Sequence, residues 1–289
     1  MNEPVASLIF KRMPSPTSGY IKAALARRHA GSEPIIPPLE AHLPGVRPHN
    51  GQVRRYAELC GYQDRSVLPL AFPHVLAAPL HLAILTHNRF PYRLLGAVHV
   101  RNSVHQQRAI GLEETLSIWV GVNGQREVRN GIEFDLETRI KDVSNDVVWH
   151  SVSTNLIRGK SRNSDGPGWT PPELASYQAV DDWRLPSHLG RRYGRLAGDI
   201  NPIHLYPLTA KLFGFQRHIA HGMWTFSRCV AALSGATAPQ RAEVTVTFRK
   251  PVFLPSRVCL YANRYGRHTD YALTDTAREV FHLTGTLKV

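Results

Sequence analysis

The 289-residue sequence predicts an α+β fold in which two similar units each wrap an antiparallel sheet around one helix. The first observation is an apolar stripe at helical spacing that occurs twice, since Val75 and Met223 begin equivalent stripes 148 residues apart (223 − 75). The second observation is that segments after each stripe alternate apolar and polar residues, as half-buried antiparallel strands do. The chain therefore repeats one plan, a helix followed by strands.

The N-terminal unit has its helix at the stripe of Val75, Ala78, Leu82 and Leu85, which are spaced by 3, 4 and 3 residues. Strand-like segments follow at 97–101, 116–122, 132–140 and 147–156. In the second of these segments the apolar residues alternate with the others, as one buried face of a strand requires.

The C-terminal unit repeats that order. Its stripe consists of Met223, Phe226, Val230 and Leu233, again spaced by 3, 4 and 3 residues. Strands are expected at 244–248, 257–263, 269–274 and 281–289.

Between the two units, residues 158–173 are dense in Gly, Pro, Ser and charge, as linkers are. We expect an N-terminal unit over 1–160, a linker over 161–180 and a C-terminal unit over 181–289. A single irregular domain with coincidental spacing is the alternative.

Composition and short sequence patterns indicate which partners to expect and exclude several classes of protein. A formal charge of +13 suggests an anionic partner, whether nucleic acid, a membrane surface or a phosphorylated small molecule. The longest apolar stretch, 68–85, is interrupted by prolines and histidines, so we expect no membrane span. With no secretory signal and three widely separated cysteines, we expect a cytoplasmic protein without a disulfide framework. No HExxH or CxxC motif is present, and we expect no metal site.

The most specific motif is G-D-x-N-P-x-H, at Gly198, Asp199, Asn201, Pro202 and His204, followed by A-H-G-M at 220–223. Proline fixes its own φ and biases the preceding residue toward extended backbone, which predicts an irregular loop between helices at 191–196 and 208–213. An aspartate and a histidine five residues apart on such a loop can hold one water, with a general base in reach of each proton.

This motif resembles the MaoC-like (R)-specific enoyl-CoA hydratases and 3-hydroxyacyl-thioester dehydratases, which have the hot-dog fold. Residues 248–258 continue the resemblance, and the N-terminal half looks like the degenerate first half of the double hot-dog members. The resemblance implies a hydro-lyase of fatty acid metabolism that interconverts (3R)-3-hydroxyacyl and trans-2-enoyl thioesters. No metal or organic cofactor is then expected, because coenzyme A or phosphopantetheine is part of the substrate.

Hydration of an enoyl thioester also needs a donor for the charge that develops on the thioester carbonyl. Gly222 begins the second apolar helix, where unpaired amides and the positive end of the dipole are available, and we assign its N–H to that role. Asn201 is a substrate-binding candidate, although it is expected mainly to orient the loop through bonds to the backbone. His221 is expected either to act in the site or only to pack or cap.

Substrate-binding candidates are the apolar residues Met223, Phe226 and Val230, because an acyl chain needs apolar walls. Shifting Asp199 and His204 back by 148 residues reaches Gly51 and Tyr56, so the acid/base pair is missing there. We therefore expect the first half to be catalytically inactive and to supply the other wall of a tunnel for the acyl chain.

Positive charge is concentrated around the motif, since 183–269 holds 13 Lys+Arg and two acids, a net +11 (13 − 2). Arg249 and Lys250 are the pair most expected to bind an acyl-CoA or an acyl carrier protein.

The alternative functions are a non-catalytic acyl-thioester-binding subunit, a related enzyme such as a thioesterase, and a nucleic-acid-binding protein. The sequence contains no signature of a nucleic-acid-binding family, so we expect no nucleic acid partner. A homodimer of the two-unit chain is possible.

Overall fold

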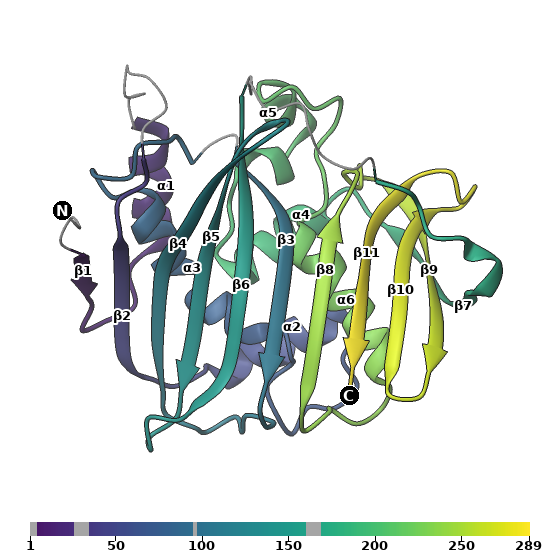
Figure 1. The fold of residues 1–289 in the computed structure, drawn as a ribbon, viewed down its shortest axis with the longest axis horizontal. Helices are drawn as coiled ribbons and strands as arrows, with labels where there is room; N and C mark the ends of the chain where they lie inside the picture. The colour runs from purple at the N-terminus through teal and green to yellow at the C-terminus, as the bar shows by residue number, and fades with distance from the viewer. Residues whose placement is uncertain (1–4, 26–34, 95–96, 160–168) are drawn as a thin grey trace.

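The computed structural model describes residues 5–25, 35–94, 97–159 and 169–289, and these form one large sheet with helices packed on one face (Figure 1). The helices are α1 (Pro16–Leu25), α2 (Asn50–Cys60), α3 (Phe72–Leu85), α4 (Leu189–Ala197), α5 (Pro207–Lys211) and α6 (Gly222–Ser234), with 3₁₀ turns η1 (Leu174–Ser176) and η2 (Pro202–His204).

The strands of the N-terminal half are β1 (Ala6–Ile9), β2 (Leu39–Val46), β3 (Ala97–Gln106), β4 (Leu116–Val128), β5 (Gly131–Lys141) and β6 (Val147–Arg158). Those of the C-terminal half are β7 (Gln178–Leu185), β8 (Ala242–Phe248), β9 (Ser256–Tyr265), β10 (His268–Asp275) and β11 (Phe281–Lys288). The eight strands and two helices predicted from periodicity are all present, and most of the strands are longer than their patterns indicated.

The sheet has the order β1-β2-β4-β5-β6-β3-β8-β11-β10-β9-β7, and this order shows a pseudo-twofold arrangement. Reading outward from the β3–β8 junction, β6-β5-β4-β2 on one side corresponds to β11-β10-β9-β7 on the other. All pairings are antiparallel except that of β1 with β2. The two halves are thus joined edge to edge, with Arg101 opposite Thr247 and Gln106 opposite Ala242.

The helices of the two halves also correspond. In each half a strand leads to a first helix (α2 or α4), then to the helix that the sheet wraps (α3 or α6), and then to four consecutive strands. α2 and α4 contact each other across the pseudo-twofold axis, where the rings of Tyr56 and Tyr193 lie 6.0 Å apart. The Tyr56 hydroxyl donates to Ser227 Oγ of α6 at 2.9 Å, so a buried hydrogen bond also joins the halves.

Two details refine the sequence interpretation. The expected linker lies partly outside the described residues, and its positions 178–180 belong to β7, which pairs with β9. Gly51 and Tyr56 lie inside α2, the counterpart of α4, so the true counterpart of the Asp199–His204 loop is the segment 61–71 between α2 and α3. That segment contains Asp64 but no histidine.

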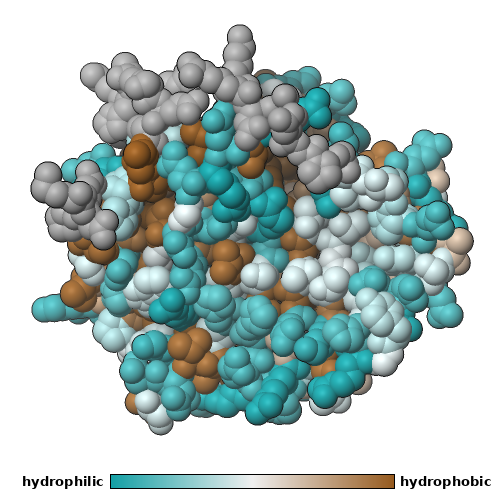
Figure 2. All heavy atoms as spheres, viewed as in Figure 1, coloured by the Kyte–Doolittle hydropathy of each residue, from teal (hydrophilic) through white to brown (hydrophobic). Residues whose placement is uncertain are grey.

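The open face of the sheet carries mostly hydrophilic and intermediate side chains with scattered hydrophobic ones (Figure 2). The apolar residues of the core lie on the opposite face, under the helices, and include Phe72, Phe134, Phe226 and Trp149. No helix in the described ranges is both long and apolar enough to cross a membrane.

Candidate active site

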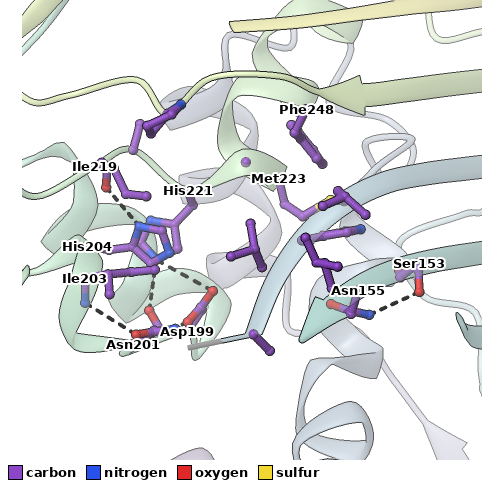
Figure 3. A pocket seen from close by; sticks show the side chains of 18 of the residues that line it. Ser153, Asn155, Asp199, Asn201, Ile203, His204, Ile219, His221, Met223 and Phe248 are labelled. Atoms are coloured by element: carbon purple, nitrogen blue, oxygen red, sulfur yellow. Dashed lines mark hydrogen bonds and ion pairs between the residues drawn. The ribbon is translucent and has the colours of Figure 1, made fainter. Parts of the chain in front are cut away.

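A cavity of about 820 Å³ lies between the two halves, and residues from both line it. α3, β3 and β6 contribute from the N-terminal half, while α4, the segment 198–222 and the end of β8 contribute from the C-terminal half. Asp199, His204 and Gly222 all line it, so the structure brings the three predicted catalytic residues to one space. Figure 3 shows the first two together on one side of that cavity.

The glycines of α4 hold the motif loop against the helix. A Cβ on Gly194 would lie 2.6 Å from the Asp199 carbonyl oxygen, and a Cβ on Gly190 would collide with the His204 carbonyl. Glycine at both positions, one helical turn apart, therefore lets the loop backbone rest directly on α4. Gly198 ends α4 in the left-handed conformation (φ 71°), which turns the chain into the loop.

The carboxylate of Asp199 accepts hydrogen bonds from two separate places in the chain. Its Oδ1 accepts a hydrogen bond from the Tyr20 hydroxyl of α1 at 2.6 Å and another from the Asn201 amide at 3.2 Å. Burial raises the pKa of Asp199, but neighbouring His221 and His204 and these hydrogen bonds outweigh it, so the pKa lies below its usual value. The carboxylate is therefore ionised at neutral pH, and its side chain keeps 39% of its surface accessible at the cavity.

His204 is buried and lies in the 3₁₀ turn η2, which the Asn201 side chain caps by accepting from the Ile203 amide. His204 Nδ1 is 2.9 Å from the Ile219 carbonyl oxygen, and since a carbonyl only accepts, Nδ1 carries the proton. Burial and neighbouring His221 lower the pKa of His204 to about 3. The ring is neutral at neutral pH, and its Nε2 offers a lone pair.

His221 completes the cluster as the residue before α6. Its Nε2 lies 3.0 Å from the Asp199 carbonyl oxygen and 3.8 Å from the carboxylate Oδ2, so Nε2 is also the protonated nitrogen. Its ring stacks on that of His204, with centroids 3.7 Å apart, and contacts Tyr193 of α4. His221 is 2% exposed and packs against both Asp199 and His204.

Gly222 begins α6 as expected. Its amide has no hydrogen-bond partner in the part of the chain that the structure describes, as is usual for the first residue of a helix. The ring of Phe248 lies 3.1 Å from where a Cβ on Gly222 would stand, so only glycine leaves this amide open to a ligand without moving Phe248.

Comparison with known proteins identifies the family. Residues 177–282 match the MaoC-like domain. Over 276 residues the chain is 34% identical to 3-hydroxyacyl-thioester dehydratase X of Mycobacterium tuberculosis, a match that covers 91% of this chain and 96% of that protein. The chain belongs to the MaoC-like dehydratase family.

Solved structures agree with that membership. The crystal structure of HtdX of Mycobacterium tuberculosis has a TM-score of 0.76 at 31% identity, covering 86% of this chain and 98% of that one. Another protein of that organism, described as having a double hot-dog fold, has a TM-score of 0.54 at 11% identity, covering 85% and 93% of the chains. The predicted family and double hot-dog fold are confirmed, and this MaoC-like protein is a hydro-lyase of the hydratase/dehydratase type.

The substrate-binding candidates of this MaoC-like protein divide into three groups. Asn201 and Met223 line the cavity. Phe226 and Val230 do not line it within the described structure, because they point into the core and are fully buried. Arg249 and Lys250 line the cavity and are exposed, as a binding site for an anionic carrier requires.

Sequence reasoning missed two contributions to the site. Tyr20 lies 179 residues from Asp199 in a helix with no marked periodicity, so no local signal indicates it. Histidines on the N-terminal side of the cavity, His74, His81 and His99, were also not assigned to the site. The two histidines within the segment 72–85, His74 and His81, are the sequence signal that could have indicated this side of the cavity.

Asp199, His204 and His221 each offer one ligand atom within 4.8 Å of the others, close enough to share a metal ion. Two of the ring nitrogens already donate to backbone carbonyls, so an ion at those atoms would displace bonds that hold the loop in place. The expectation of a metal-free site stays a prediction.

Proposed function

We propose that this protein adds water to trans-2-enoyl thioesters, and removes it from (3R)-3-hydroxyacyl thioesters, with Asp199 and His204 as the acid/base pair. The observation that carries the proposal is the convergence of an ionised carboxylate, a neutral imidazole and an open helix N-terminal amide on one cavity. The named activity of the similar mycobacterial dehydratase, which acts on 3-hydroxyacyl thioesters, supports it.

The pair activates one water. The carboxylate of Asp199 and the Nε2 lone pair of His204 both accept, so a water between them donates one hydrogen to each and turns an oxygen lone pair toward the substrate. In hydration that oxygen forms a bond to the β-carbon, one O–H bond breaks, and the pair takes the proton. The electrons of the double bond move to the α-carbon and the thioester oxygen, and the pair returns a proton to the α-carbon.

The Gly222 amide stabilises the enolate formed in this step. The thioester oxygen gains negative charge there, and the N–H at the positive end of α6 donates to it. Removal of such a donor costs about 2.7–4 kcal/mol of barrier in other enzymes. Dehydration runs through the same enolate in reverse.

The substrate is proposed to arrive on coenzyme A or an acyl carrier protein, both of which are anionic. Arg249 follows β8 at the edge of the cavity, and its guanidinium lies 4.6 Å from the ring centre of Trp169. Lys250 follows it and is exposed. We expect KM for an enoyl-CoA to rise with salt and to rise in Arg249→Ala, since exposed ion pairs are screened.

The direct test is spectrophotometric hydration of enoyl-CoA thioesters of several chain lengths, with chiral analysis of the product. We expect Asp199→Asn and His204→Ala to lower kcat by roughly 10²–10⁴-fold while both variants keep the wild-type fold. Asp182→Asn and His268→Ala, at exposed positions away from the cavity, are the matched controls. Near-normal rates in Asp199→Asn and His204→Ala would overturn the assignment, and release of free thiol without hydration would indicate a thioesterase instead.

Metal independence is tested on the same enzyme. We expect unchanged kcat after dialysis against a strong chelator, because the proposed steps use only protein groups and water. A loss that added divalent ions restore would show that the Asp199–His204–His221 group works as a metal site.

A further inference from the structure

A second group of histidines lines the cavity and has no part in the mechanism above. His74 lies in the first turn of α3, His81 lies about two turns further along the same helix, and His99 lies on β3. Their rings pack together, with centroids 5.1 Å apart for His74 and His81 and 6.0 Å apart for His74 and His99. We call these three residues the histidine triplet.

One aromatic ring separates the triplet from the oxyanion position. Phe248 lies against Gly222 on one side, and its ring is 5.3 Å from that of His99 on the other. Asp199 is also near enough that its charge acts on the pKa of His74 and of His99. Figure 3 places Phe248 and Asn155 on one side of the cavity and Asp199 with His204 on the other. The triplet therefore lies along the same cavity, beyond the reacting atoms.

The walls around the triplet are those of an acyl chain site. Leu82, Leu85, Leu136 and Leu156 line this part of the cavity, all from the N-terminal half. The exposed Arg249 and Lys250, which suit the carrier, belong to the other half. Because these leucines lie in the same part of the cavity as the triplet, we infer that a group touching it is carried on the acyl chain.

Two ring nitrogens of the triplet have no hydrogen-bond partner within the described part of the chain. His81 Nε2 hydrogen-bonds Thr138 Oγ1 at 2.7 Å. His74 Nδ1 and His99 Nε2, in contrast, are buried with no partner among the described residues. A buried polar atom left without a hydrogen bond costs free energy, and binding sites for polar groups contain such atoms.

The triplet is uncharged at neutral pH, since burial lowers the pKa of His99 to about 4, that of His81 to about 3 and that of His74 well below its usual value. A neutral imidazole has one N–H and one lone pair. Its natural partner is a group that both donates and accepts, and the triplet itself carries no fixed positive charge to bind an anion.

We propose that the triplet recognises a hydroxyl group on the acyl chain of the substrate, remote from the thioester. Ser153 and Asn155 of β6, which also line the cavity, would add polar contacts on the same wall. This inference rests on the proposed function, because it assigns the substrate of that same site. A plain hydrocarbon chain would leave the unpartnered ring atoms facing methylene groups, and a carboxylate placed at the triplet would meet neutral rings that do not neutralise its charge.

The test compares substrates on the wild-type enzyme. trans-2-Decenoyl-CoA is assayed beside analogues with one hydroxyl, moved one carbon at a time from the ω end toward the double bond, and beside the analogue that ends in a carboxylate. We expect kcat/KM to be about tenfold higher for at least one hydroxylated chain than for the plain chain. A plain or carboxylated chain that equals or exceeds every hydroxylated one would overturn the inference.

The variants then locate the preference. His99→Phe and His74→Phe keep an aromatic ring but remove the polar atoms, and we expect each to lower the ratio of hydroxylated to plain kcat/KM several-fold. His105→Phe, the same change at an exposed position of β3 outside the cavity, should leave the ratio unchanged. An unchanged ratio of hydroxylated to plain kcat/KM in both His99→Phe and His74→Phe would also overturn the inference. If no enoyl-CoA of any kind is hydrated, the proposed function fails instead, which is a distinguishable result.

Discussion

At the scale of single residues, the site depends on how the N-terminal half supports Asp199. Tyr20 reaches the carboxylate from α1, and it is the one donor to that carboxylate among the described residues that comes from the first half. Burial and the neighbouring carboxylate raise the pKa of the Tyr20 hydroxyl, so it stays protonated and donates. Tyr20 is a positioning residue that also favours the ionised form of Asp199.

Tyr20→Phe should therefore shift the pH profile as well as lower the rate. Loss of the hydrogen bond removes one of the effects that lower the pKa of Asp199, so that pKa rises. We expect the acidic limb of kcat/KM to move up by about one pH unit, since a hydrogen bond to a charged group contributes about 1.5–3 kcal/mol. The measurement is kcat/KM against pH, with Tyr265→Phe at the exposed end of β9 as control. An unshifted limb would contradict this role.

The sequence predicted the three central residues for a physical reason. Asp199, His204 and Gly222 lie within one short stretch, where proline, glycine and a helix start constrain the backbone locally. Tyr20 could not be predicted, because its contact with Asp199 depends on how two halves of the molecule meet. Phe226 and Val230 were assigned to the pocket because an apolar stripe does not show which of its residues face a cavity and which face the core.

At the scale of elements, α4 determines where the motif loop lies. Its two glycines form a flat strip on which the carbonyls of Asp199 and His204 rest. The same contact fixes the Asp199 carbonyl oxygen, which accepts a hydrogen bond from His221 Nε2. Small displacements here would move both members of the proposed acid/base pair together.

Gly194→Ala is expected to lower kcat/KM by roughly 10²-fold, because a misplacement of about 1 Å in a catalytic group has effects of that size. Gly190→Ala should do the same by moving His204. The matched control is Gly51→Ala in α2, the counterpart helix, where the neighbouring atom belongs to the exposed His49 side chain. That control should keep full activity and melt no lower than wild type, since alanine favours helix. Full activity in Gly194→Ala would show that the close packing is unimportant.

Periodicity predicted most elements that have one clearly buried face, and missed β7, β2 and α2 for different reasons. β7 is an edge strand with mostly exposed residues, so it shows no alternation. β2 is interrupted in pattern by Pro44 and Gly45 near its end. α2 carries its own stripe of Val53, Ala57 and Cys60 and could have been predicted from spacing.

At the scale of the whole molecule, the two halves have the same topology but different chemistry. The segment 198–221 of the second half carries the proposed acid/base pair, while its counterpart 61–71 is shorter and has no histidine. The first half instead contributes Tyr20 and the histidine triplet to the shared cavity. A single active site per chain, and pairing of two chains, stay predictions that active-site titration and light scattering would test.

The cavity also makes the stability of the protein sensitive to acid. His81, His99 and His204 have pKa values lowered to about 3, 4 and 3 by burial, while histidine in an unfolded chain titrates near 6.5. Between these values the unfolded state binds more protons than the folded state, so stability rises with pH. Lowering the pH from 7 to 5 should therefore reduce the free energy of unfolding, by up to about 2 kcal/mol for each of these histidines.

Urea unfolding at the two pH values measures this loss, and a single variant isolates one contribution. His81→Gln keeps a side chain able to hydrogen-bond Thr138 but cannot take up a proton, so its stability should fall less between pH 7 and pH 5 than that of wild type. His268→Gln, at an exposed position, should fall as much as wild type. The comparison separates the buried histidines from the general effect of added positive charge, which all three proteins share. Equal losses in wild type and His81→Gln would mean that His81 does not resist protonation in the folded protein.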